Sequence, residues 1–176
     1  MPALKIEGLY EIKGKVLRSS VLESGKSAAR ITVHMGTCGI SSGAADILQV
    51  FKEELKSSKR KDISVTTSGC AGICNREPLI TVERVGEEPV KYADVTKEKA
   101  REIFRKHVVK GEGMPQWVFS RGWEQKEMDF EGPPSAKMDK TPHTRDIPFF
   151  GMQSPVVMKN RGLIQAERIE EYIARD

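Results

Sequence analysis

The sequence predicts an α/β fold in which helices pack on one mixed sheet. Two β-branched runs, 29–35 and 62–67, flank an amphipathic helix at 43–57, which is the pattern of two parallel strands joined by a crossover. Two more strand-like runs and a capped helix follow before residue 112. The resulting order, β-α-β-β-β-α, indicates a layered α/β sandwich.

The N-terminal segment, residues 1–24, predicts a helix. Leu9, Ile12 and Val16 fit one helical face, although two glycines within the segment lower its helix propensity. The first strand, residues 29–35, follows this segment and ends at a glycine-containing loop.

The central helix, residues 43–57, has the clearest periodicity in the chain. Its apolar residues recur at helical spacing on one face, namely Ala44, Ile47, Leu48, Phe51 and Leu55. Because parallel strands need a crossover connection, this helix joins the strand at 29–35 to the strand at 62–67. The loops that follow these two strands are then expected at one end of the sheet.

The next elements predict a hairpin and a closing helix. Runs 78–85 and 89–95 are strand-like and are separated by a turn that begins at Gly86. Thr96 is a suitable N-cap for a helix from Lys97 to about Val109.

The sequence changes character after residue 112. Six of the nine prolines lie beyond this point, and residues 113–145 are interpreted as a linker. Residues 146–176 predict a short strand at 156–159 and a helix at 165–174. The predicted organisation is therefore an N-terminal helical segment (1–24), the α/β domain (25–112), the linker (113–145) and the start of a further domain (146–176).

Composition and charge exclude several classes of protein. No run approaches the roughly 20 apolar residues of a membrane span, and residues 1–5 lack the apolar core of a signal peptide. The three cysteines, an odd number, argue against an exported disulfide framework, so a cytoplasmic location is expected. The densest basic run, 56–61, contains no aromatic residue, so it indicates a solvated helix end rather than a nucleic-acid surface.

Two short loops contain the candidate functional residues. The first loop holds His34 and Cys38, and the second holds Cys70 and Cys74. Each loop places two metal donors four positions apart on backbone that contains glycine, and the β-α-β connection is expected to bring the loops together. Such an arrangement is typical of a metal or iron–sulfur centre built from two loops.

Other cysteine chemistries fit the spacing less well. Dithiol exchange of the thioredoxin type uses Cys-x-x-Cys at a helix start, whereas the second loop here has Cys-x3-Cys and leads into a strand. A nucleophilic cysteine would need a base with an orienting group, and neither loop contains an acidic residue. Thiolates favour zinc and iron–sulfur centres, and the residues alone leave both open.

A family resemblance narrows this choice. Stretches 36–44 (Gly-Thr-Cys-Gly-Ile-Ser-Ser-Gly-Ala) and 68–74 (Ser-Gly-Cys-Ala-Gly-Ile-Cys) resemble the thioredoxin-like [2Fe–2S] ferredoxin domain. The likeness is to the domain at the N-terminus of the NADH-binding flavoprotein (beta) subunit of NAD(P)-dependent, electron-bifurcating [FeFe]-hydrogenases and of related complex I-type subunits. Stretches 147–150, 156–162 and 169–175 resemble the lead-in to the flavin- and NADH-binding domain of those subunits.

The resemblance implies an electron-transfer module with one [2Fe–2S] cluster. Many members of the family carry Cys-x4-Cys in the first loop, and His34 stands where the first of those cysteines would be. The implied ligands are Cys38, Cys70 and Cys74 with His34 or another donor as the fourth, and glycine N–H groups are expected to bond the sulfurs. The implied partners are flavin/NADH-binding and hydrogenase-type subunits, with no nucleic acid and no membrane insertion.

No catalytic residue is expected in this chain itself. The 176 residues contain no glycine-rich nucleotide fingerprint, so NADH oxidation would belong to a partner. Two alternatives stay open at this point. One is a docking or assembly domain whose cluster site has decayed, and the other is a structural zinc module with Cys3His ligation.

Overall fold

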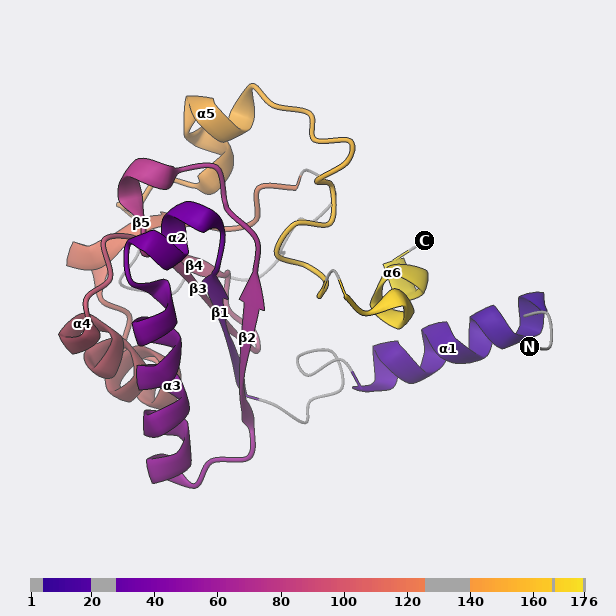
Figure 1. The fold of residues 1–176 in the computed structure, drawn as a ribbon, viewed down its shortest axis with the longest axis horizontal. Helices are drawn as coiled ribbons and strands as arrows, with labels where there is room; N and C mark the ends of the chain where they lie inside the picture. The colour runs from indigo at the N-terminus through magenta and orange to yellow at the C-terminus, as the bar shows by residue number, and fades with distance from the viewer. Residues whose placement is uncertain (1–4, 20–27, 126–139, 166, 176) are drawn as a thin grey trace.

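The computed structural model describes residues 5–19, 28–125, 140–165 and 167–175. Within them, five strands form one mixed sheet in the order β2-β1-β3-β4-β5 (Figure 1). β1 and β2 are parallel, and the other neighbouring strands are antiparallel. The strands are β1 (Ala29–His34), β2 (Ile63–Ser68), β3 (Ile80–Arg84), β4 (Val90–Tyr92) and β5 (Val118–Arg121).

The crossover between the two parallel strands positions the candidate loops. α3 (Ala44–Ser58) connects β1 to β2, and the register pairs Ala29 with Ile63 and His34 with Ser68. Because the two strands end level with each other, the loops after them begin side by side at the same end of the sheet.

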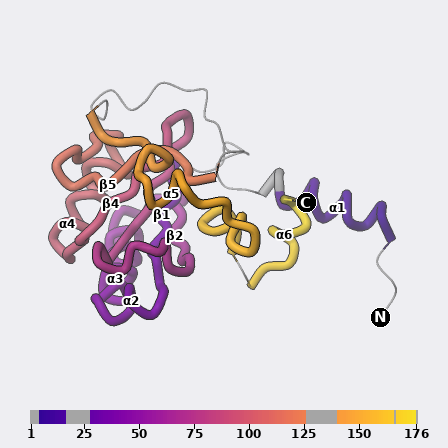
Figure 2. Tube along the Cα trace, turned by 90° about the horizontal axis from the view of Figure 1, so that it is seen from above, coloured from indigo at the N-terminus to yellow at the C-terminus, as the bar shows by residue number. Residues whose placement is uncertain are grey.

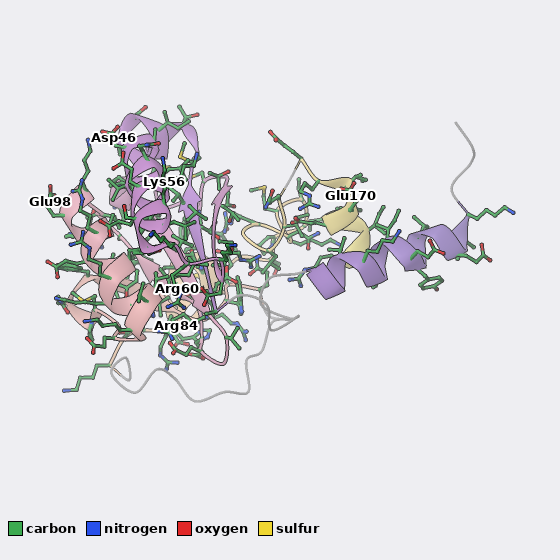
Figure 3. The ribbon with its side chains drawn as sticks, turned by 90° about the horizontal axis from the view of Figure 1, so that it is seen from below. Asp46, Lys56, Arg60, Arg84, Glu98 and Glu170 are labelled. Carbon is green, nitrogen blue, oxygen red and sulfur yellow. The ribbon has the colours of Figure 1, made fainter. Side chains whose placement is uncertain are left out.

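A helical layer covers the apolar face of the sheet. α3 packs beside α4 (Lys97–Glu102), which continues into the π-helical turn η2 (Ile103–Val108) (Figure 1). Thr96 caps α4 by accepting a hydrogen bond from the Lys99 N–H. Alternate strand residues meet the helices in one buried core, which includes Ile31, Val33, Ile80, Val82, Val90 and Tyr92 from the sheet and Ile47, Phe51, Ile103 and Phe104 from the helices. The exposed carboxylates of Asp46 and Glu98 mark the outer side of this layer (Figure 3).

The opposite face of the sheet is polar and is nevertheless buried. Glu83 is 3% exposed and Lys91 is 4% exposed. The Arg30 guanidinium donates two hydrogen bonds to the Glu83 carboxylate, from Nε at 2.9 Å and from Nη2 at 2.6 Å. Burial lowers the pKa of Lys91, and the carboxylates of Glu124 and Glu83 oppose that shift. Glu124, which follows β5 in the chain, therefore lies close enough to this face to interact electrostatically with Lys91.

The C-terminal region packs on the sheet and then leaves it. After β5 come η4 (Thr144–Asp146) and α5 (Pro148–Gly151), which lies at the same end of the sheet as α2 (Thr37–Ser41) (Figure 1). Residues 156–163 form turns, and α6 (Ile169–Arg175) then packs beside α1 (Ile6–Ser19), away from the sandwich (Figures 1 and 2).

The predicted fold class is confirmed. The structure has the β-α-β crossover, the β3–β4 hairpin, the closing helix and an N-terminal helix in the expected order. The order β2-β1-β3-β4, with β1 parallel to β2 and antiparallel to β3, is that of a thioredoxin-like α/β sandwich. None of the described helices combines the length and apolar character that crossing a membrane requires.

Several local predictions were wrong. Residues 156–159, predicted as a strand, form turns, because no neighbouring strand pairs with their backbone in the described part of the chain. β5 lies within the predicted linker and extends the sheet by pairing with β4, although residues 126–139 of that linker lie outside the described residues. The first loop contains a short helix, α2, which was predicted as a loop. The domain boundaries stay a prediction.

Candidate functional site

The first loop begins where β1 ends. The Met35 N–H donates to the Ser68 carbonyl at 2.7 Å, so the end of β1 remains tied to the end of β2. Gly36 then serves as the N-cap of α2, and Cys38 is the second residue of that helix. The Cys38 side chain is exposed.

The second loop turns its apolar residues inward and its cysteines outward. Ala71 is 1% exposed and packs with Leu79 and Ala93, whereas Cys74 is exposed and Cys70 is partly exposed. Arg76, in the turn η1 (Cys74–Arg76), fixes the far end of the loop through a hydrogen bond to Asp94 of 2.9 Å. The loop is thus held on both sides of its sulfur atoms.

The two cysteines of the second loop form a close sulfur pair. Their Sγ atoms lie 3.7 Å apart, and the Gly72 N–H donates to Cys70 Sγ at 3.1 Å. Burial raises the pKa of the Cys70 thiol, and the Gly72 hydrogen bond opposes that shift. The expected hydrogen bond from a glycine N–H to a cysteine sulfur is therefore present at Gly72.

The two loops touch at Gly36. A Cβ atom built on Gly36 would lie 2.5 Å from Cys70 Cβ, so any larger residue at this position would collide with the second loop. Cys38 follows two residues later. The predicted juxtaposition of the two cysteine loops is therefore present.

His34 is held by hydrogen bonds to the second loop and to β3. Its Nδ1 lies 3.1 Å from the Gly69 carbonyl, and its Nε2 lies 3.0 Å from Thr81 Oγ1. Since a carbonyl only accepts, Nδ1 carries the proton and Nε2 accepts from the Thr81 hydroxyl. Burial, followed by the charge of Lys91, lowers the pKa of His34 to about 4, so the ring is neutral at physiological pH. Both ring nitrogens are occupied, and the ring ties the second loop to the sheet.

Glu77 is an acidic residue at this site that the sequence analysis did not identify as a candidate. It is 8% exposed, Oε2 accepts the Leu79 N–H at 2.7 Å, and Oε1 is buried with no hydrogen-bond partner among the residues that the structure describes. Burial raises the pKa of Glu77. A Cβ atom built on Gly39, next to Cys38, would lie 3.3 Å from Oε2, so Glu77 stands between the two loops.

The sulfur pair has the spacing of two thiolates on one metal. Two sulfurs bound tetrahedrally at about 2.3 Å lie about 3.8 Å apart, whereas a disulfide bond brings them to about 2.05 Å. The observed 3.7 Å, which is also the spacing of a thiol–thiol hydrogen bond, fits the former and excludes a disulfide. Within the described residues no three His, Cys, Asp or Glu side chains converge on one point as a single bound ion would require. The geometry is a thiol pair in one loop with a third thiol on the loop beside it. A two-iron cluster, which takes two donors on each iron, fits such an arrangement.

Comparisons with known proteins place the chain in a family. It is 34% identical over 73 residues to the [2Fe–2S] ferredoxin of Clostridium pasteurianum, and the match covers 41% of this chain and 69% of that protein. The chain belongs to the [2Fe–2S] ferredoxin family. This membership confirms the family predicted from the two cysteine motifs. No family model matches the chain.

A second relative and two solved structures are also similar. The chain is 26% identical over 106 residues to the NADP-reducing hydrogenase subunit HndB of Solidesulfovibrio fructosivorans, covering 60% of this chain and 82% of that protein. A thioredoxin-like [2Fe–2S] ferredoxin from Aquifex aeolicus aligns with a TM-score of 0.49 and 23% identity over 55% of this chain and 94% of its own. A second structure, of the wild-type form, aligns at 0.47 and 22% over 53% of this chain and 98% of its own.

Proposed function

We propose that the chain is a one-electron carrier that holds a [2Fe–2S] cluster through Cys38, Cys70 and Cys74. The Cys70–Cys74 sulfur pair is the observation that carries the proposal, because its 3.7 Å spacing suits two thiolates on one iron. Membership of the [2Fe–2S] ferredoxin family supports the same conclusion. When bound, the cluster supplies a site that accepts and releases single electrons.

The protein supplies ligands, hydrogen bonds and partial burial. Cys70 and Cys74 would hold the cluster from one loop, and Cys38 would hold it from the neighbouring loop. Because Cys38 is the remaining cysteine of the 176 residues, the fourth donor is not a thiolate of this sequence. His34 would have to give up its bond to Gly69 or Thr81 to serve, so we assign it the structural role of fixing the second loop.

The similarity to an NADP-reducing hydrogenase subunit supports a place in a hydrogenase-type complex. There the chain would pass single electrons between a flavin/NADH-binding subunit or domain and a hydrogenase-type subunit. The chain itself supplies no substrate chemistry in this proposal.

The test is the metal content and visible spectrum of the anaerobically purified chain. We expect about two irons and two sulfides per chain, with a visible spectrum that bleaches on reduction with dithionite. Cys70→Ser and Cys74→Ser should each abolish the visible absorption, whereas His34→Gln should retain it. One zinc per chain, or no metal after reconstitution with iron and sulfide, would overturn the proposal.

A further inference from the structure

Two side chains from the C-terminal region lie against the loop that carries the sulfur pair. A Cβ atom built on Gly72 would lie 3.0 and 3.1 Å from the Cζ and Cε1 atoms of Phe149, and 3.7 Å from Nη1 of Arg161. Gly72 stands between Cys70 and Cys74. Residues 77 and 89 positions further along the chain therefore pack on the middle of the cysteine loop.

Arg161 is fixed in this position by its own contacts. Its Nε and Nη2 donate to the two carboxylate oxygens of Glu124 at 3.0 and 2.8 Å, and the Gln125 amide donates to the Arg161 carbonyl at 2.8 Å. The side chains of Arg161 and Glu124 are 11% and 9% exposed. The forked pairing orients the planar guanidinium and leaves Nη1 as the nitrogen nearest Gly72.

Phe149 is held in place by α5, which is anchored to the end of β5. Thr144 is fully buried, and its hydroxyl lies 2.9 Å from the carbonyls of Arg121 and Gly122 at the end of β5. α5 follows directly, and Phe150 is 5% exposed and packs edge-to-face with Phe149 at a centroid distance of 5.1 Å. The Phe149 ring is thus placed on Gly72 by an element anchored to the sheet.

We propose that Phe149 and Arg161 form a fixed cover over the Cys70–Cys74 loop. The ring limits the access of water and reagents to the sulfur pair, and the guanidinium raises the reduction potential of the bound cluster. The second effect rests on the proposed function. Solvent exposure and nearby charge are two of the means by which a protein sets such a potential, and a fixed cation favours the reduced, more negative state.

The first test needs no cluster. In the metal-free full chain, the rates of alkylation of Cys70 and Cys38 by iodoacetamide are followed by peptide mass spectrometry, and Cys38 serves as the internal reference. Phe149→Ala should raise the rate at Cys70 several-fold relative to Cys38, because it opens the loop to the reagent. Val156→Ala, at an 82%-exposed position of the same region, should leave the ratio unchanged. An unchanged ratio in Phe149→Ala would overturn the cover.

The second test measures the reduction potential of the reconstituted full chain. Arg161→Gln should lower the potential, and Arg161→Lys, which keeps the charge, should restore most of the difference. Arg168→Gln makes the same charge change at a 53%-exposed side chain and should have little effect. Equal potentials for the wild type and Arg161→Gln would overturn the electrostatic role.

The two tests separate this inference from the proposed function. If the wild-type chain takes up no cluster, the proposed function fails and the potential-setting role fails with it, whereas the alkylation ratio still decides whether the cover exists. If a cluster forms and neither ratio nor potential responds, the electron-carrier proposal stands and the cover is wrong.

Discussion

Replacing Gly72 by alanine tests how tightly the C-terminal region holds the cysteine loop. Gly72 has a φ of +87°, and a Cβ atom there would lie 3.0 Å from the Phe149 ring. Two separate effects should therefore destabilise Gly72→Ala. One is the left-handed backbone conformation, and the other is the collision with the ring.

The structure provides glycines at which each effect can be isolated. Gly43 has a φ of +97°, and no atom of the described residues lies within 4 Å of its built Cβ, so Gly43→Ala should show the backbone effect alone, about 1–2 kcal/mol. Gly69 has no positive φ and no described neighbour within 4 Å of its built Cβ, so Gly69→Ala should change stability by less than about 0.5 kcal/mol. Since carbon atoms prefer about 3.5–4.0 Å, the ring must shift in Gly72→Ala. Because Phe149 is 45% exposed, this shift should add about 1 kcal/mol, the lower end of the cost of overpacking.

The assay is urea unfolding of the metal-free chain, analysed as a double-mutant cycle with Phe149→Ala. Removing the ring should relieve the collision but not the backbone strain. The double variant should therefore recover only the stability that Gly72→Ala loses through the collision with the ring. If Gly72→Ala loses no more stability than Gly43→Ala, and Phe149→Ala does not couple to it, the ring is not held on the loop and the reasoning fails.

Two further predictions concern buried titratable groups of the polar sheet face. The pKa of His34 is lowered from 6.5 to about 4, so between these values the unfolded chain binds a proton that the folded chain does not. Stability should therefore fall as the pH drops from 6.5 to 4, by up to roughly 3 kcal/mol from this group. Urea midpoints of the metal-free chain at pH 7 and 4.5 measure this, and His34→Gln should show a smaller difference; an equal difference would contradict the assignment. Arg30→Met should lower the free energy of unfolding by about 3–5 kcal/mol at pH 7, because it leaves the buried Glu83 carboxylate without its forked partner. The double variant Arg30→Met/Glu83→Leu should recover most of that loss, and a failure to recover it would show that the packing of Arg30 matters more than its charge.

The sheet and helices were predictable because their patterns are local. The stripe of the 43–57 helix and the β-branched runs on either side require a crossover, and the crossover fixes which strand ends meet. β5 was missed because Val118–Arg121 is short and lies in a proline-rich stretch. Its strand character comes from pairing with β4, which is a tertiary contact.

The site was predictable only in part, because some of its contacts are tertiary and join residues far apart in the sequence. The spacing of Cys70 and Cys74 and their approach to the first loop follow from the loop sequences and the strand register. The hydrogen bonds that occupy His34 depend on Thr81, which lies 47 residues away, and no sequence spacing shows this contact. Phe149 and Arg161 lie within stretches 147–150 and 156–162. Their resemblance to the lead-in of a flavin- and NADH-binding domain indicated the start of a further domain and gave no sign of contact with the cysteine loop.

Two features of this site, its fourth donor and Arg161, act in one direction on the proposed cluster. With three thiolates and a fourth donor that is not a cysteine of this sequence, a neutral fourth donor would remove one negative charge relative to four-thiolate ligation, which raises the reduction potential. The Arg161 guanidinium beside Gly72 adds to that effect, and its pairing with Glu124 reduces but does not cancel it, because Nη1 is the nitrogen nearest the loop. On the proposed ligation, the site is therefore better suited to receive electrons from a low-potential donor than to act as that donor.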